Sequence, residues 1–285
     1  MSSRQAAGDV FPRRDGPLDV LRDNLSGTVT GSLGTFGRAM RSGAAATRAA
    51  AEDIVRLRFQ WHEFLAQTWF LITVTAVPGV LMAVPFGVIV SAQVGNVVFQ
   101  LGANSLIGAA GGLGVIKQGA PLATGLLLGG AGAAAIAADL GARTIREEVD
   151  ALRVMGIDPV RRLVAPRLVA MLVVAPLLNI LILFVGVVAG YLVSVAALDV
   201  TPGSYWESFG SFVSSADVWV SLLKAMIFGF LVVVIACQRG LEARGGPRGV
   251  ADGVNAAVIL SVVSVAVVNT AITQVVAVFM PSKVA

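Results

Sequence analysis

The sequence predicts an all-α integral membrane protein with five transmembrane helices, on the strength of its composition and its charge distribution. Of its 285 residues, 56% are hydrophobic and only 13% are charged, and the mean hydropathy is +0.83. Soluble domains carry about 25% charged residues, so most of this surface cannot face water. The charges are also confined, since 18 of the 21 lysines and arginines fall within residues 1–67, 141–167 and 239–253.

The apolar stretches between these segments have the length of membrane-spanning helices. A hydrocarbon core of about 30 Å is crossed by about 20 apolar residues in a helix. Two spans separate each charged segment from the next, so all three lie on one side, which the positive-inside rule makes cytoplasmic. We therefore expect a multi-pass inner (plasma) membrane protein with a cytoplasmic N-terminus and an extracytoplasmic C-terminus. The predicted spans lie near residues 69–98, 119–140, 168–198, 218–238 and 256–280.

The segment before the first span divides into two parts. Residues 1–33 are polar and predict a flexible cytoplasmic tail. Within residues 34–67, apolar side chains such as Phe36 and Met40 alternate with arginines, a pattern typical of an amphipathic helix at the membrane surface. An alternative is a soluble helix that packs on a partner. Residues 68–285 form the predicted membrane domain.

The two connections on the outer side carry few charges. Residues 99–118 are rich in glycine, have Lys117 as their only charge, and are expected to form a partly re-entrant connection. Residues 199–217 carry four aromatic side chains but no Lys or Arg. They resemble an interfacial segment or a landing surface for an extracytoplasmic partner.

Motifs for several catalytic chemistries are missing from the sequence. It has no Gly-x-x-x-x-Gly-Lys-Ser/Thr, so it cannot hold ATP phosphates by the P-loop route. Its only histidine, His62, cannot supply a His-rich metal set or a Ser-His-Asp triad. We expect no catalytic residue, no metal and no cofactor in this chain.

A group of acids offers the only enzyme-like constellation. On the cytoplasmic side they could bind Mg²⁺ in a membrane-embedded enzyme that acts on lipid headgroups. Arginines interleave with them, so a solvated helix face is the more ordinary interpretation. This enzyme remains the alternative function. Its acids are Asp139, Glu147, Glu148, Asp150 and Asp158.

The same segment also predicts a short helix between the second and third spans. Acids open it, where they favour the positive end of the helix dipole, an apolar stripe follows, and a Gly-Ile-Asp-Pro run ends it. A helix of this kind would dock into a groove on a soluble partner, as the coupling helix of an ATP-driven transporter would. The candidates for coupling to an ATPase are Glu147, Glu148, Asp150, Ala151, Leu152, Met155, Gly156, Asp158 and Pro159.

This region resembles the signature of MlaE/YrbE permeases, the membrane subunits of ABC lipid transporters that work with MCE-domain proteins. The resemblance covers roughly residues 34–280. The Arg-rich composition makes the chain similar to a YrbE subunit of an actinobacterial (mycobacterial) Mce system. The runs that carry the resemblance are EEVDALRVMGIDP at 147–159, LVAPR at 163–167, GAP at 119–121, GGAG at 129–132, ADLG at 138–141 and RGVA at 248–251.

The resemblance implies a non-catalytic subunit in a larger assembly. Five transmembrane helices behind an interfacial helix would pair with a second, different YrbE-type permease. A cytoplasmic ATPase dimer would bind ATP and Mg²⁺, and MCE proteins would sit on the outer face. Hydrolysis would then move a lipid of the fatty acid, mycolic acid or sterol class between the MCE tunnel and the inner membrane. A third interpretation is a scaffold subunit with no lipid path of its own.

Two lysines stand out in the apolar part of the chain. Lys224 lies about two turns inside the fourth predicted span, where a charge costs about 2.5–3.5 kcal/mol unless it snorkels or faces a polar cavity. In the family, the positions of Lys117 and Lys224 carry basic residues near the lipid pocket, so the resemblance implies that both meet an anionic group. Gln118 stands where relatives often carry Glu and is the third substrate-path candidate.

Overall fold

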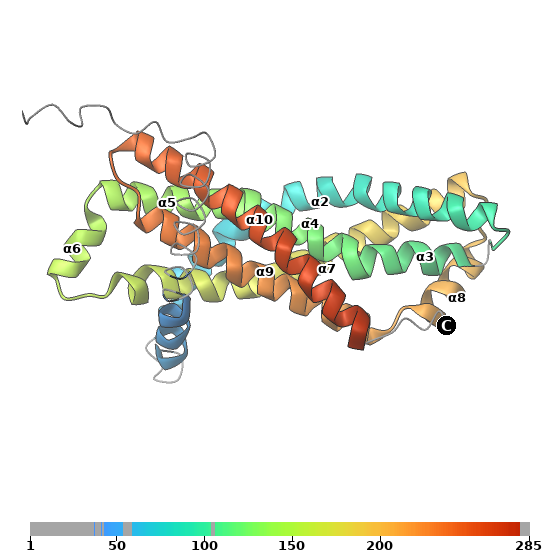
Figure 1. Ribbon diagram of the computed structural model, residues 1–285, viewed down its shortest axis with the longest axis horizontal. Coiled ribbons are helices and arrows are strands. Elements are labelled where there is room, and N and C mark those ends of the chain that lie inside the picture. The colour runs from blue at the N-terminus through green and yellow to red at the C-terminus, as the bar shows by residue number, and fades with distance from the viewer. Residues whose placement is uncertain (1–36, 38–40, 42, 54–58, 104–105, 280–285) are drawn as a thin grey trace, which may run out of the picture. The chain divides into compact units, whose positions relative to one another are not determined.

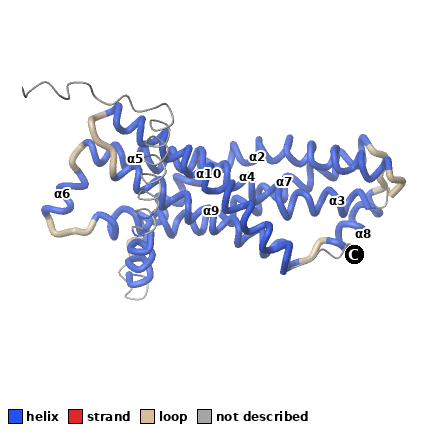
Figure 2. Tube along the Cα trace, viewed as in Figure 1, coloured by secondary structure: helices blue, strands red, loops and turns tan. Residues whose placement is uncertain are grey.

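The computed structural model describes residues 37, 41, 43–53, 59–103 and 106–279. Every regular element among these residues is a helix (Figure 2). The chain divides into two units, Met1–Arg41 and Ser42–Ala285, and the architecture below is that of the second. Five of its helical stretches are long and apolar enough to cross a membrane, which confirms the predicted number of spans: Trp61–Gln100, Ile107–Ile145, Val160–Ala197, Ser215–Leu241 and Pro247–Phe279.

Two of these stretches contain short π-helical turns, labelled η: two turns join the α-helices of the second span, and one begins the third span. The elements follow in the order α2 (Trp61–Gln100), α3 (Ile107–Gly114), η2 (Val115–Gly119), α4 (Ala120–Leu127), η3 (Leu128–Gly132), α5 (Ala133–Ile145), α6 (Glu148–Val154), η4 (Val160–Val164), α7 (Ala165–Ala197), α8 (Pro202–Phe212), α9 (Ser215–Leu241) and α10 (Pro247–Phe279). The short helices α6 and α8 lie at opposite ends of the long ones (Figure 1).

The glycine-rich stretch 99–118 differs from its prediction as a re-entrant connection. It is helical from Ile107 onward and belongs to the second span. Its glycines allow α3 to lie against α8: a Cβ on Gly108 would lie 2.2 Å from the backbone oxygen of Tyr205, and a Cβ on Gly112 would lie 2.4 Å from the ring of Phe209. Small residues that let helices approach closely are common between membrane helices. The glycines therefore serve packing and do not break the helix.

The helix α2 packs mainly on α7 through a stripe of mostly small residues. A Cβ on Gly87 would lie 2.3 Å from the backbone oxygen of Gly186, and a Cβ on Gly190 would lie 2.2 Å from Oγ of Ser91. The Gly186–Gly190 pair is therefore used for close packing within this chain. The buried face of α2 repeats every fourth residue: Gln67, Leu71, Thr75, Gly79, Ala83, Gly87, Ser91 and Gly95.

A short helical segment at 43–53 packs on α9 and on η4. A Cβ on Gly43 would lie 2.7 Å from a methyl group of Val234. At the end of the segment, Nε of Arg161 donates to both carboxylate oxygens of Asp53, at 2.9 and 2.7 Å. This bidentate ion pair ties the segment to the start of the third span. Four apolar anchors of the predicted membrane-surface helix lie outside the described residues, namely Phe36, Met40, Ile54 and Leu57.

The helix α8 is held by an aromatic cluster. The ring of Tyr205 lies 5.2 Å from that of Tyr191 and 5.5 Å from that of Trp206, and Tyr205 is almost fully buried. Burial raises the pKa of the Tyr205 hydroxyl to about 12, so it stays protonated at neutral pH. Trp206 remains half exposed, as expected for an aromatic residue at a membrane interface.

We predict that Gly87→Ala destabilises the protein by about 1–3 kcal/mol, because overpacking of a tight contact forces neighbouring backbone to move. The matched control is Gly130→Ala, where a Cβ would meet nothing within 4 Å. That change should be neutral or stabilising by about 0.5–1 kcal/mol, since Ala loses less entropy than Gly in a helix. Denaturant unfolding in mixed micelles measures both. Equal stabilities of the two variants would contradict the close α2–α7 contact.

Candidate functional site

The first candidate site is α6 with its flanking turns. Its first turn carries Glu148 and Asp150, and the chain turns away at Gly156, which has a φ of +75°. The short helix predicted for this segment is therefore present, at the predicted place between the second and third spans. Glu147 precedes it with a φ of +61°, a conformation that is uncommon for a residue with a side chain.

The outer surface of α6 is apolar at its C-terminal end. Val154 is 90% exposed, and Met155 and Ile157 are also exposed. Its acids are paired locally: Glu148 lies 3.1 Å from Arg146, and Asp150 lies 2.7 Å from Arg153. The helix thus combines exposed apolar side chains with neutralised charges. Val154 and Ile157 were not among the sequence candidates, although their place beside Met155 in an apolar run signals them.

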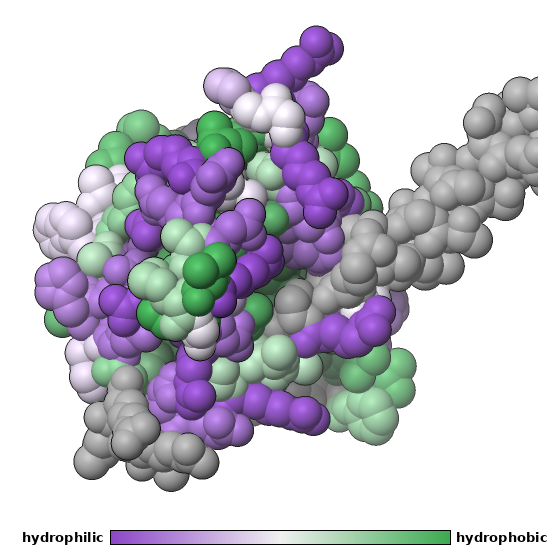
Figure 3. Space-filling model, turned by 90° about the vertical axis from the view of Figure 1, so that its left-hand side faces the viewer, coloured by the Kyte–Doolittle hydropathy of each residue, from purple (hydrophilic) through white to green (hydrophobic). Residues whose placement is uncertain are grey.

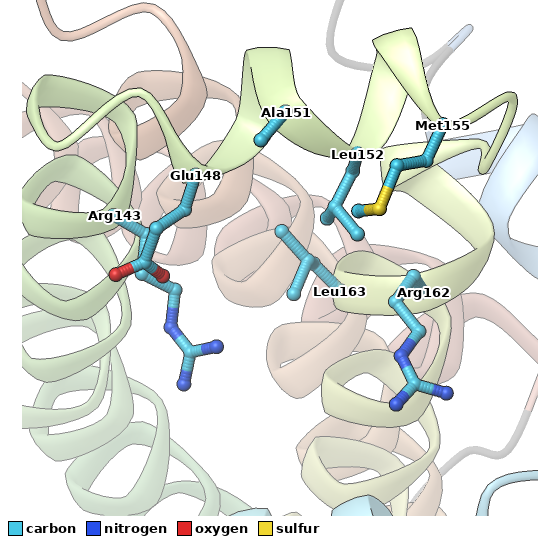
Figure 4. A pocket seen from close by; sticks show the side chains of 7 residues that line it. All are labelled: Arg143, Glu148, Ala151, Leu152, Met155, Arg162 and Leu163. Atoms are coloured by element: carbon cyan, nitrogen blue, oxygen red, sulfur yellow. The ribbon is translucent and has the colours of Figure 1, made fainter.

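The inner side of α6 covers a small pocket of about 310 Å³. Figure 4 shows Leu152 and Met155 extending from α6 towards Leu163 of η4, with Glu148 and Arg143 on one side. The pocket wall is mainly apolar. It separates the C-terminal part of α6 from the start of the third span, whereas Val149 of α6 is buried and packs on the rest of the protein.

The nine coupling candidates lie together on this connection. All are exposed except Leu152, which is partly buried, and Pro159, which is buried at the start of η4. Seen from the α6 end, the visible described surface is mostly hydrophilic, with smaller apolar patches among the polar side chains (Figure 3). This end of the molecule therefore has the character of a water-facing surface.

The second candidate site brings together all three substrate-path candidates, of which Lys224 is buried, Lys117 is partly exposed and Gln118 is exposed. Nζ of Lys224 donates to the backbone oxygen of Lys117 at 3.1 Å and to Oγ1 of Thr273 at 3.0 Å. Nε2 of Gln118 donates to the same Thr273 oxygen at 3.3 Å. Three spans thus converge here, and Thr273 of α10 is the residue that sequence analysis missed.

A proline explains why the Lys117 carbonyl is available to Lys224. In an α-helix this oxygen accepts from the N–H four residues later, but that residue is Pro121, which has no N–H. Lys224 supplies the missing donor from α9. The proline spacing was the signal in the sequence, but the identity of the donor depends on helix packing.

The two lysines differ in their electrostatic surroundings. Nζ of Lys117 lies 3.3 Å from the carboxylate of Asp217, which also caps the start of α9 by accepting from the N–H of Ser214. Lys224 is only 3% exposed, and among the described residues no carboxylate pairs with it. Its two acceptors are neutral oxygens, so neither of them offsets a positive charge on this amine.

A buried polar chain begins one turn from Lys224. Nδ2 of Asn179 donates to Oγ of Ser221 at 2.9 Å, and its Oδ1 lies 3.2 Å from Oγ1 of Thr124. All three are fully or almost fully buried. These three polar side chains link α7 to α9 and α4 by specific hydrogen bonds in the apolar core.

Comparison with known proteins connects both sites to one family. The family model described as Permease MlaE matches residues 64–275. This chain belongs to the MlaE permease family. Among its relatives, a probable ABC transporter permease protein of Synechocystis sp. is 31% identical over 64% of this chain and 70% of its own length. One of Rickettsia felis is 29% identical over 88% of this chain and 97% of its own length.

A third MlaE-family relative carries a more specific name. The intermembrane phospholipid transport system permease protein MlaE of Haemophilus influenzae is 29% identical over 61% of this chain and 67% of its own length. The family match spans α6, the lysine site and all five membrane helices from residue 64 to 275. The helical segment at 43–53 precedes the match.

The acids of this MlaE-family chain do not gather into a metal site. Among the described residues, no three His, Cys, Asp or Glu side chains lie close enough to hold a metal ion. Asp139 contacts Arg143 and Arg167 instead, and Glu148 and Asp150 also pair with arginines. Three of the five acids considered for a lipid-headgroup enzyme are therefore engaged in separate ion pairs.

We predict that Glu147→Gly stabilises the protein by about 1 kcal/mol, because Gly avoids the cost of a left-handed backbone. The matched change Glu148→Gly, one residue later and inside α6, should destabilise it by about 0.5–1 kcal/mol. Denaturant unfolding in mixed micelles measures the difference. If the two substitutions shift the free energy of unfolding in the same direction, the assignment of a left-handed conformation to Glu147 is wrong.

Proposed function

We propose that this chain is a permease subunit of a multi-subunit ABC-type Mce lipid transporter. The single observation that carries the proposal is α6, a short exposed helix with apolar side chains between two membrane spans of a permease-family protein. Such a helix fits a groove on a soluble partner. The partner is a cytoplasmic ATPase, which binds ATP and Mg²⁺, and α6 faces the cytoplasm.

In this proposal the ATPase contacts the exposed side of α6. Val154, Met155 and Ile157 fill an apolar groove, while the ion-paired acids Glu148 and Asp150 lie at its polar rim. The apolar contacts supply affinity, and the charges set the register. Movement of the ATPase on hydrolysis then pushes on α6 and, through its flanking turns, on the second and third spans.

The lysine site contacts the transported lipid. Lys224 offers a buried positive charge with only neutral acceptors, and this attracts a carboxylate or phosphate group. Lys117 can turn from Asp217 to the same group, and Gln118 adds a further donor. Fatty acids, mycolic acids and, through a polar group, sterols are the classes that we infer. The phospholipid transport named for the Haemophilus influenzae relative supports a lipid cargo.

The remaining partners follow from the exposed surfaces. The helices α2 and α10 are the least buried of the five spans, so they are available to membrane lipid and to a second YrbE-type permease in a heterodimer. The α8 end carries the aromatic cluster and faces outward, where MCE-domain proteins form the tunnel. Lipid passes between that tunnel and the inner membrane, and this chain itself carries out no catalysis.

A headgroup enzyme using Asp139 and the nearby acids is less well supported. Asp139, Glu148 and Asp150 are each paired with arginines. An enzyme would show Mg²⁺-dependent turnover with the purified chain alone, whereas a permease requires its partners. A scaffold subunit would bind the ATPase but would not retain lipid.

We predict that the tagged chain, extracted gently from native membranes, brings with it a soluble ATPase, a second YrbE-type permease and MCE proteins. The double variant Glu148→Lys and Asp150→Lys should lose ATP-driven transport, because it replaces two acids by two bases at the ATPase contact. It should still recover the second permease, since its membrane part is unchanged. Mass spectrometry identifies the proteins that co-purify with each chain. ATP-driven transport is measured separately, as ATP-dependent lipid movement by the reconstituted complex.

Two results would overturn this assignment. If the wild-type chain is recovered alone, its assignment to an ABC transporter is wrong. The acids between Asp139 and Asp158 would then be assayed for enzyme activity. If the double-lysine variant still couples ATP hydrolysis to transport as the wild type does, α6 is not the contact for the ATPase. The exposed-arginine variant Arg244→Gln serves as a charge control far from α6 in sequence, and it should behave like wild type.

We predict that Lys224→Gln lowers the amount of anionic lipid retained by the purified complex about ten-fold, the value of one strong charge-assisted hydrogen bond. Lys117→Gln should have a smaller effect, because Asp217 already neutralises that lysine. Lipid mass spectrometry of equal amounts of complex measures retention. Unchanged lipid retention when Lys117→Gln and Lys224→Gln are combined in one chain would exclude both lysines from the lipid path.

A further inference from the structure

A second buried cation lies near the α6 end of the bundle. Arg167, at the start of α7, is 0% exposed. One of its guanidinium nitrogens donates to the backbone oxygen of Leu163 at 2.6 Å, and the other contacts the carboxylate of Asp139 in α5. The other oxygen of Asp139 accepts from Nε of Arg143 at 3.3 Å. Nε of Arg167 has no partner.

These contacts join the two helical arms that carry α6. Asp139 and Arg143 lie on α5, which leads into α6, and Arg167 and Leu163 lie on the chain that leads out of it. Arg143 and Leu163 also line the pocket beneath α6. The ion pair therefore closes the base of the loop whose tip is α6.

The location of the pair argues against a purely incidental contact. Arg167 is fully buried, and a charge taken out of water is costly unless it is paired and hydrogen-bonded. A buried ion pair is also weak evidence for stability, because well-packed apolar residues of similar volume often replace it without loss. A role in transmitting movement accounts for its presence better than a role in folding does.

We propose that Asp139 and Arg167 are positioning residues that make α5, α6 and α7 move as one unit. The inference rests on the proposed function of α6. With the pair in place, force on α6 displaces both spans together, because the guanidinium group holds Asp139 and the Leu163 carbonyl at the same time. Without it, the pocket beneath α6 lets the loop deform while the spans remain still.

The test separates movement at α6 from movement at the opposite end. Gly203 of α8 is exposed, and a Cβ there would meet nothing within 4 Å. Gly203→Cys therefore carries a fluorophore, in a background in which the buried Cys237 is replaced by Ala. The complex with its ATPase is placed in nanodiscs, and two quantities are measured: the rate of ATP hydrolysis and the ATP-dependent change in fluorescence.

The main variant is Asp139→Leu with Arg167→Met, which removes both charges of the buried pair, while the partly exposed Arg143 loses its contact with Asp139. We expect it to fold, bind the ATPase and hydrolyse ATP within about two-fold of wild type, while the fluorescence change falls about five-fold or more. Arg167→Lys keeps a positive charge but loses the guanidinium group that contacts two acceptors at once, so its fluorescence change should be intermediate. A wild-type fluorescence change in either variant would overturn the proposal, and Arg167→Lys decides the matter if the double variant does not fold.

A stability control and the wild type complete the design. Ile182→Ala removes a buried apolar side chain from the middle of α7 and should lower thermal stability without lowering the fluorescence change. If it lowers both, loss of stability alone explains the main variant and the positioning role is wrong. If the wild-type complex binds no ATPase, or shows no ATP-dependent change, the proposed function fails, which is a different result from failure of the ion pair.

Discussion

The structure depends on the requirement that polar backbone groups in a membrane find partners inside the protein. Pro121 breaks the internal supply, because it has no N–H for the carbonyl of Lys117. The donor comes from Lys224 on another span, which also reaches Thr273 on a third. The buried lysine therefore supplies a donor that Pro121 cannot, and its two hydrogen bonds connect three spans.

A second backbone oxygen also receives a hydrogen bond from a buried cation. Arg167 reaches the carbonyl of Leu163, which lies in the π-helical turn η4, as Lys117 lies in η2. π-turns are rare and occur frequently at functional sites. In both places a buried cation donates to a carbonyl of the turn, from a different span for Lys224 and from the next turn of the same span for Arg167. The two cations differ in that Arg167 has a carboxylate partner and Lys224 has none among the described residues.

Sequence alone predicted the parts of this fold that depend on composition. Charge-free stretches located the five spans, and acids followed by an apolar run and Gly156 located α6. It failed for the glycine-rich stretch 99–118, because Gly108 and Gly112 acquire their packing role only when α8 lies beside them. Lys117, Gln118 and Lys224 were identified separately, but Thr273 was not, since its contact with Gln118 spans 155 residues of sequence.

The contact between Gly87 and Gly186 has a consequence for where hydrocarbon can pass. At this point the backbones of α2 and α7 nearly touch, and no side chain stands between them that could rotate aside. An acyl chain cannot slip through a gap that excludes a single methyl group. The seam between these two helices is therefore closed to lipid, and any sideways exit from the bundle must open along a different pair of helices.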